Sequence, residues 1–415
     1  MQSKPLLSIP HRLYALPQAI LHMSLLCGGL ALTAPLFAHE GSHDDSASTP
    51  GLDMSLSAGW RYIAADQPFP PPRIDGVLGA GSPLDDQRYG DLDYAEVALR
   101  ARFNADSGGA LRITRHGLDN GDTNLEALWL DARNPDWGLG GRAGRQEVPV
   151  GFENLIHSHA RTFGISPLAL RASIGDDWLA DGLRVDQDIG AGFSLGAGLW
   201  NNQSYPGSDS TGLNLATARL TWVGDPWRLQ LSYAYADADG RALLTTGQGG
   251  HTHTTPSCDG APTLDKVCFD GKVNIAVLAA RWQPNDLPWW FGGEYWYKHE
   301  SGVIDSIYGV PDYTGRLGSG WMDIGYRFTK DLSVAARVEQ LQMSNEITGV
   351  NAGLIARQSG IANADQTPYG VGLVVEWYPV SALRLVGEWH YSDLNEQSDN
   401  IFMLRAQINF DQKIF

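Results

Sequence analysis

Histidines in this chain occur in close pairs, and such pairs can bind a metal ion. The first pair is His39 and His43, the second is His157 and His159, and the third is His251 and His253. Neutral imidazole is a common ligand for zinc, copper and nickel, and two histidines in one loop can chelate. None of the pairs has the four-ligand spacing of a structural zinc site. Two interpretations therefore stay open: a site for zinc or another divalent cation, with no cofactor required, or incidental metal binding.

The same histidines raise the question of catalysis. Ser158 lies between His157 and His159, and Asp176 or Asp177 could complete a nucleophile, base and acid. Nothing in the spacing distinguishes these residues from ordinary polar loop residues. The segment 318–320, Gly-Ser-Gly, lacks the full Gly-x-Ser-x-Gly pattern of a nucleophile elbow. We therefore predict that the protein is not an enzyme.

Residues 1–38 have the pattern of a secretory signal peptide. Lys4 and Arg12 precede an apolar run at 21–37, and Ala38 precedes a polar stretch. A membrane anchor is the alternative, but glycine, histidine and proline interrupt the run and no basic flank follows it. We predict cleavage after Ala38 and a short segment rich in histidine and aspartate at 39–51.

Export and charge limit the remaining possibilities. Cys258 and Cys268 lie ten residues apart in a polar loop, and in an exported protein we expect them to form a disulfide rather than two free thiols. The net charge of −17 argues against nucleic acid as a partner. The chain also contains 48 Gly, 14 Trp and 15 Tyr, which suits an all-β protein with apolar residues at alternate positions.

Alternating segments recur along the chain from residue 52. At 227–235, a set of Trp, Leu and Tyr residues alternates with Arg, Gln and Ser. This is the period-2 pattern of a strand with one apolar face. Short and long connections alternate between these segments, as they do in outer-membrane barrels. A soluble sandwich would not be expected to alternate connections so regularly. The predicted strands are 52–64, 92–104, 108–117, 123–133, 136–146, 178–187, 191–202, 212–223, 226–237, 270–283, 287–299, 314–329, 331–343, 367–378, 381–392 and 400–412.

The fold class predicted for 52–415 is all-β, a transmembrane antiparallel β-barrel of about 16 strands, between roughly 14 and 18. Its polar face carries both signs of charge, which favours a water-filled lumen. A circle of this many strands is too wide for wall side chains alone to fill, so another segment must narrow it. The long connection at 147–177 is the candidate.

This connection carries a family resemblance. The segment 141–153 reads Gly-Arg-Ala-Gly-Arg-Gln-Glu-Val-Pro-Val-Gly-Phe-Glu. It resembles the phosphate-selective porins of Gram-negative outer membranes, in which a strand ends in Gly-Arg and Pro-Phe-Gly and Glu follow. Val150 stands at the Phe position. The acidic chain also departs from that family's ladder of Lys and Arg, which anion selectivity requires.

The resemblance implies a sixteen-stranded porin whose third outer loop folds into the lumen. The loop residues then expected at the constriction are Glu147, Glu153, His157, His159 and Arg161. The opposing wall residues would be Arg100, Arg102, Arg112, Arg142 and Arg145. A transverse field between loop acids and wall arginines would orient passing solutes. The alternative is a solvated lid across the outer mouth.

The predicted function is passive diffusion of small hydrophilic solutes or ions across the bacterial outer membrane. The alternatives are a channel or receptor for divalent metal of the zinc type, which would use the histidine segments, and an adhesive barrel. The expected partners are outer-membrane lipid, lipopolysaccharide and small solutes or ions. The resemblance also implies a homotrimer.

Overall fold

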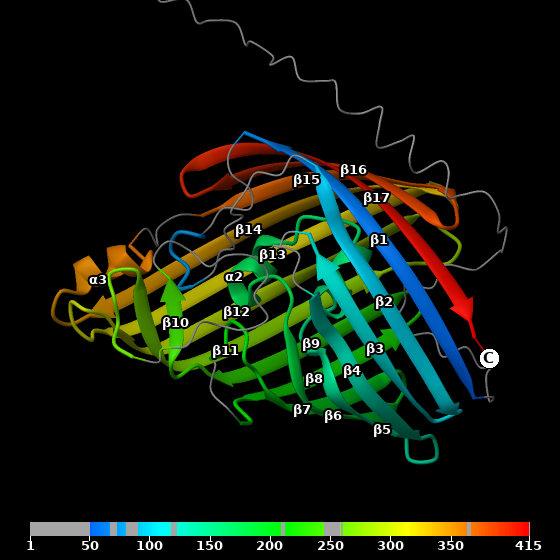
Figure 1. The fold of residues 1–415 in the computed structure, drawn as a ribbon, viewed down its shortest axis with the longest axis horizontal. Coiled ribbons are helices and arrows are strands. Elements are labelled where there is room, and N and C mark those ends of the chain that lie inside the picture. Colours follow the sequence, from blue (N-terminus) through cyan, green and yellow to red (C-terminus); the bar gives the residue numbers. More distant parts are fainter. Residues whose placement is uncertain are drawn as a thin grey trace, which may run out of the picture. The chain divides into compact units, whose positions relative to one another are not determined.

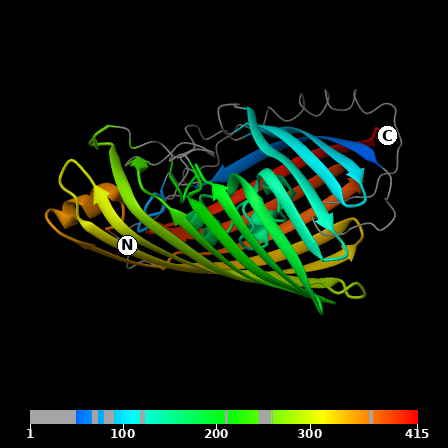
Figure 2. The same cartoon turned by 90° about the horizontal axis from the view of Figure 1, so that it is seen from below.

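The computed structural model describes residues 50–66, 73–79, 90–117, 123–208, 212–244, 258, 260–362 and 367–414. In these residues, sixteen strands form one closed antiparallel barrel (Figures 1 and 2). They are β1 (Gly51–Ala65), β2 (Asp91–Asn104), β3 (Ser107–His116), β4 (Thr123–Asn134), β5 (Leu139–Glu147), β6 (Leu179–Gly190), β7 (Phe193–Asn201), β8 (Leu215–Gly224), β9 (Trp227–Asp237), β11 (Lys266–Trp282), β12 (Trp289–Asp305), β13 (Asp312–Thr329), β14 (Leu332–Thr348), β15 (Tyr369–Val380), β16 (Leu383–Leu394) and β17 (Gln397–Lys413).

The first and last strands close the barrel. β1 pairs with β2 on one side and with β17 on the other, from Asp53 opposite Lys413 to Ala65 opposite Ile401. All other neighbours in the barrel are consecutive barrel strands. Closure leaves no open sheet edge, which is the condition for a sheet in lipid, where no water can satisfy edge groups.

A seventeenth strand is a short extension and not a further strand of the barrel wall. β10 (Arg241–Leu244) pairs with the start of β11, at Lys266 to Phe269. β9 pairs with β11 further along, from Asp237 opposite Lys272 onward. β10 therefore continues the row of β9 after a break, at the end of the barrel where α3 (Ala352–Ser359) also lies (Figure 1).

The barrel turns its apolar residues outward, as the alternation predicts. On β9, Leu229, Leu231 and Tyr233 are exposed, whereas Gln230 and Ser232, which alternate with them, are buried. This is the reverse of a soluble protein and is the pattern of a barrel with lipid outside and polar groups within. The sixteen predicted strands correspond to the sixteen barrel strands, with ends shifted by a few residues.

Two connections predicted to be long are shorter than expected. β16 and β17 pair as far as Leu394 opposite Gln397, so 393–399 is a hairpin rather than a loop. Its two turn residues, Asn395 and Glu396, have φ values of 56° and 60°, which suits a tight turn that follows the strand twist. β12 and β13 likewise pair as far as Val303 opposite Asp312, within the predicted loop 300–313.

The helices in the described residues are few and short. They are η1 (Glu153–Leu155), η2 (Ser158–Ala160), α2 (Leu168–Ile174) and α3. In the part of the chain that the structure describes, no helix has both the length and the apolar character needed to cross a membrane.

The predicted disulfide is present, with the Cα atoms of Cys258 and Cys268 5.9 Å apart. Other predictions fall on residues outside the described ranges. These are the signal peptide at 1–38 and almost all of the segment 39–51.

Candidate functional site

Residues 148–178, the third connection, join β5 to β6 and run against the inward face of the barrel. The connection contains η1, η2 and α2. Pro167 precedes α2, and Gly175 ends it in the left-handed conformation with φ of 82°. Leu168, Leu170 and Ile174 of α2 are buried, and α2 contacts β12, β13 and β14. The apolar helix therefore packs against inward apolar residues of the wall.

The wall that receives this helix is more apolar than the sequence suggested. Trp200, Trp296 and Trp321 point inward and are buried in one cluster with Val148 and Val150 of the third connection. Strand alternation predicts aromatic residues outside and polar residues inside at these strands. Sequence reasoning missed the inward tryptophans, because each of them lies among polar or small residues on its strand.

Three wall glutamates accept hydrogen bonds from the backbone of the third connection. Each points inward from an even-numbered strand between β12 and β16, and each is buried. They are Glu294, which accepts from the N–H groups of Phe152 and Glu153 at 2.7 Å, Glu339, which accepts from Leu168 at 2.7 Å, and Glu388, which accepts from Gly164 at 2.7 Å and Ile165 at 3.3 Å. Such charge-assisted bonds satisfy loop N–H groups that have no strand partner.

Wall cations bind the carbonyl groups of the same connection. They include Arg337, which donates to Ile165 at 3.1 Å, Arg384, which donates to His159 at 3.0 Å and Arg161 at 2.8 Å, Arg405, which donates to Thr162 at 3.1 Å, and Lys298, which donates to Ala172 at 3.0 Å. The third connection is thus held to the wall at both its N–H and its C=O groups, from β12 to β17.

Gly151 lets the connection approach the wall closely. Its φ is 73°, which favours glycine, and a Cβ there would lie 2.4 Å from Oε2 of Glu294. The Pro-Val-Gly segment that carries the family resemblance therefore has a steric role in docking the connection onto β12.

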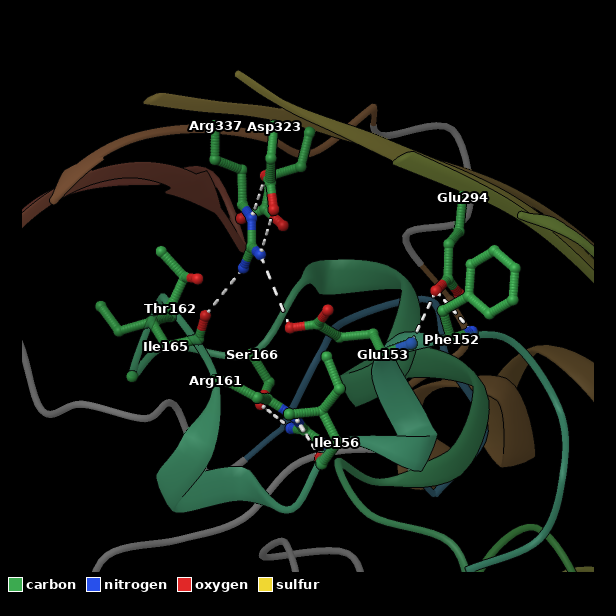
Figure 3. Close-up of polar contacts among 12 residues, drawn as sticks. Phe152, Glu153, Ile156, Arg161, Thr162, Ile165, Ser166, Glu294, Asp323 and Arg337 are labelled. Atoms are coloured by element: carbon green, nitrogen blue, oxygen red, sulfur yellow. Dashed lines mark hydrogen bonds and ion pairs between the residues drawn. The ribbon is translucent and has the colours of Figure 1, made fainter. Parts of the chain in front are cut away.

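Glu153 is the centre of a buried charge group rather than a pore-facing acid. Its carboxylate lies 3.1 Å from Arg281 and 3.8 Å from Arg337. Arg337 also donates to both carboxylate oxygens of Asp323, at 2.7 and 2.8 Å (Figure 3). Each charge in this group therefore has an opposite partner. Through Arg281 and Arg337, Glu153 attaches the third connection to β11 and β14.

Arg161 was predicted to line the constriction, and the structure contradicts this. Its side chain is 1% exposed, and its guanidinium donates to the Ile156 carbonyl and to Ser166 Oγ (Figure 3). Burial alone would lower its pKa, but the carboxylates of Asp177 and Asp176 outweigh burial and hold that pKa above its ordinary value. Arg161 therefore links separate parts of the third connection to one another.

Replacing Arg161 with methionine is expected to loosen the third connection without opening the barrel. Hydrogen bonds to charged groups each contribute about 1.5–3 kcal/mol, so amide exchange in 156–166 should rise about tenfold or more. Hydrogen exchange with mass spectrometry measures this. Arg357→Met on exposed α3 is the control, and equal exchange in the two variants would contradict the role assigned to Arg161.

Glu147 and Arg112 were predicted on opposite sides of a constriction, and the structure joins them in a direct ion pair. Nη1 of Arg112 on β3 donates to Oε1 of Glu147 at 3.1 Å, and Nε of Arg112 lies 3.7 Å from Oε2 of Glu96 on β2. This joins the end of β5, directly before the third connection, to the β2–β3 wall. The pair is only partly exposed, so its charges neutralise each other beside the lumen.

His157 and His159 both face wall carboxylates. Nε2 of His157 lies 2.8 Å from Glu96 and 3.4 Å from Glu126, and the ring of His159 stacks on Tyr94 at 3.6 Å. Burial lowers the pKa of His159 well below its ordinary value.

The six histidines predicted to bind a metal ion do not share one outcome. Within the described residues, His157 belongs to a group of possible metal ligands and His159 does not. The predictions for His39 and His43 lie outside the described residues. Those for His251 and His253 also lie outside them. The metal prediction therefore gains structural support at the third connection, and at the other two pairs it stays a prediction.

Of the other predicted wall arginines, Arg100, Arg102 and Arg145 do not oppose the third connection. Arg100 and Arg102 follow Glu96 by four and six residues toward the short-turn end of β2, which is about 13–20 Å along the strand. Arg142 lies over the Trp129 ring at 3.7 Å. Arg145 is paired in register with Leu128, which is exposed on the outer face, so it does not face the lumen. The predicted field between loop acids and wall arginines therefore does not include Arg100, Arg102 or Arg145.

Sequence reasoning missed several inward charges that the structure brings together. Arg219 of β8 donates to Asp186 of β6 at 2.8 Å, and Arg184 lies 3.4 Å from the same carboxylate. Listing the inward positions of the predicted strands 178–187 and 212–223 could have identified these charged residues. The pairing of two arginines with one aspartate depends on register, which no single strand reveals.

Neither a protein-family model nor a curated protein sequence matches this chain. Its fold resembles solved outer-membrane barrels. A loop-deletion form of OmpT, an outer membrane protein of Vibrio cholerae, aligns with a TM-score of 0.55 at 14% identity over 87% of this chain and 99% of that one. OmpF of Salmonella typhi, in complex with daunomycin, aligns with a TM-score of 0.55 at 12% identity over 86% of this chain and 97% of that one.

A trimer form of Vibrio cholerae OmpT aligns with a TM-score of 0.53 at 13% identity, over 87% of this chain and 99% of that one. At these identities the likeness shows the fold. The chain therefore has the architecture of the outer-membrane β-barrel proteins, a closed antiparallel barrel of sixteen strands.

Proposed function

We propose that this protein is an outer-membrane porin that lets small hydrophilic solutes or ions diffuse passively. The observation that carries the proposal is a closed barrel with apolar residues outside, charged residues inside and a connection that occupies part of the lumen. The apolar outer face suits outer-membrane lipid and lipopolysaccharide. The trimer form of the Vibrio cholerae protein supports a homotrimer here.

The exposure of inward charges indicates where the water path runs. Arg337 and Arg405 on β14 and β17 are covered by the third connection, with side chains only 1% and 2% exposed. Asp186 on β6 and Arg281 on β11 are more open, at 29% and 33%. The proposed path therefore passes between the third connection and the wall from β5 to β11.

The open part of this wall carries both signs of charge. Asp186 is shared by Arg184 and Arg219, and Arg142 lies 3.8 Å from Asp131. Paired charges attract ions of either sign only weakly, so we propose small hydrophilic solutes or ions without strong charge preference. This arrangement gives no support to the phosphate selectivity of the resembled family.

The double variant Arg184→Gln/Arg219→Gln is expected to shift the reversal potential toward cations, because it leaves Asp186 unpaired beside the water path. Single-channel recording of the purified protein in planar bilayers under a salt gradient measures this. Arg316→Gln, on an exposed position of β13, is the control. Absence of any channel activity in the unaltered protein would overturn the proposed function.

A divalent-metal channel or receptor is the second candidate. It is favoured by His157 and His159, whose side chains extend from the third connection toward wall carboxylates. If zinc is the transported solute, zinc should carry current in a zinc-only gradient, and His157→Ala/His159→Ala should abolish it. A zinc current that persists in the double variant would exclude these histidines from the path.

A further inference from the structure

Glu96 and Glu126 reach the same threonine from the two strands that flank it. Oε2 of Glu96 on β2 lies 3.0 Å from Oγ1 of Thr114 on β3, and Oε2 of Glu126 on β4 lies 2.9 Å from the same atom. A hydroxyl has one proton to donate, so it serves only one carboxylate at a time. The two carboxylates repel each other, and a cation between them would remove this cost.

His157 approaches this pair from the third connection. Its Nε2 atom lies 2.8 Å from Oε2 of Glu96 and 3.4 Å from Oε2 of Glu126. Ligand atoms of His157, Glu96 and Glu126 lie within 4.8 Å of one another. Four ligands around zinc at 2.0–2.2 Å are about 3.3–3.6 Å apart, so this spacing suits one shared ion.

We propose that Glu96, Glu126 and His157 form a divalent-cation site of the zinc type that links the third connection to β2 and β4. Imidazole nitrogen with two carboxylate oxygens is a donor set that zinc accepts, with a further position left for water. His157 precedes η2 directly, so a bound ion would fix the connection to the side of the barrel opposite Glu294 and Glu339. This proposal does not depend on the proposed channel function, because zinc binding can be measured without ion flow through the pore.

His116 is a positioning residue for this site. Its Nε2 atom lies 2.5 Å from Oε1 of Glu126, whereas Oε2 of the same carboxylate faces His157. Ligating carboxylates are commonly held by such an outer partner, which fixes their orientation. His159 is not a ligand, because its ring is stacked on Tyr94 and its Nδ1 atom lies 4.0 Å from Asp93.

Calorimetric titration of the purified full-length protein with Zn²⁺ tests the site. One binding event should weaken by about tenfold or more in His157→Ala and Glu96→Gln, since each removes a ligand. His159→Phe, which keeps an aromatic ring against Tyr94, should retain this event. A double variant, His251→Ala with His253→Ala, alters another histidine pair and should also retain it. Loss of zinc binding only in that double variant would overturn the proposal.

A melting experiment separates metal binding from an ion pair in which protonated His157 joins the two glutamates. Zinc should raise the melting temperature of the unaltered protein and of His159→Phe, but not that of Glu96→Gln, which keeps the side-chain volume. His116→Gln should weaken zinc binding less than loss of a ligand does. If zinc raises the melting temperature of Glu96→Gln and of the unaltered protein equally, the cluster is an ion pair and the proposal fails. Channel recordings on the same samples report the proposed function separately.

Discussion

A variant in which residues 152–162 are replaced by a short Gly-Ser linker is expected to show a single-channel conductance about twofold or more above that of the unaltered protein. A barrel of sixteen strands leaves an aqueous channel unless another segment enters it. The removed segment includes η1 and η2, which are held against β11, β12, β14 and β16. The wall groups that lose these partners would be hydrated by lumen water.

Planar-bilayer recording measures the change, and the structure offers a matched control. Replacing α3 by the same linker removes a helix of a different connection, which packs on β14 at the end of the barrel (Figure 1). This control should keep the original conductance. Equal conductance in the linker variant and the unaltered protein would show that the third connection does not narrow the pore.

Arg337→Met is expected to cause the largest loss of stability among single substitutions on the wall. Arg337 is 1% exposed and holds Asp323, Glu153 and the Ile165 carbonyl (Figure 3). Removing it leaves buried acids without their main partner, and breaking a buried ion pair costs about 3–5 kcal/mol. Urea unfolding in lipid vesicles, followed by tryptophan fluorescence, measures the free energy of unfolding.

Two further variants show whether the buried charge is the cause. Arg316→Met alters an exposed arginine on the neighbouring strand β13 and should change stability by about 0.5 kcal/mol or less. Arg337→Leu/Asp323→Leu removes both charges, and it should be more stable than Arg337→Met because fewer acids stay unpaired. If Arg337→Met and Arg316→Met unfold alike, the ion pairs in Figure 3 contribute little to stability.

The predicted strands match the observed strands because the pattern that predicts a strand is visible within that strand alone. A strand such as β9 shows its two faces within a few residues, because successive side chains point to opposite sides. The period-2 signal therefore survives without knowledge of the neighbours. Connections are harder, and the 393–399 hairpin was missed because Asn395 and Glu396 resemble ordinary loop residues until the flanking strands are known to pair.

The candidate site was predictable only in part. Glu147, Arg112 and the two histidines of the third connection were predicted to line a constriction. The structure brings Arg112 to Glu147 and His157 to His159, which sequence spacing did not predict. Arg161 was placed in the lumen because an arginine in a polar loop is usually solvated. Its partners Asp176 and Asp177 lie fifteen and sixteen residues away, and only the folding of the connection brings them to it.

The sequence by itself determined that this is an antiparallel β-barrel with an apolar outside, because strand alternation is a local property. Only the tertiary structure decided how the third connection is held. Glu294 meets the backbone of Phe152 across 142 positions, and Glu96 and Glu126 meet His157 only when β2, β3 and β4 are in register. Contacts of this kind depend on barrel closure, and no short stretch of sequence carries them.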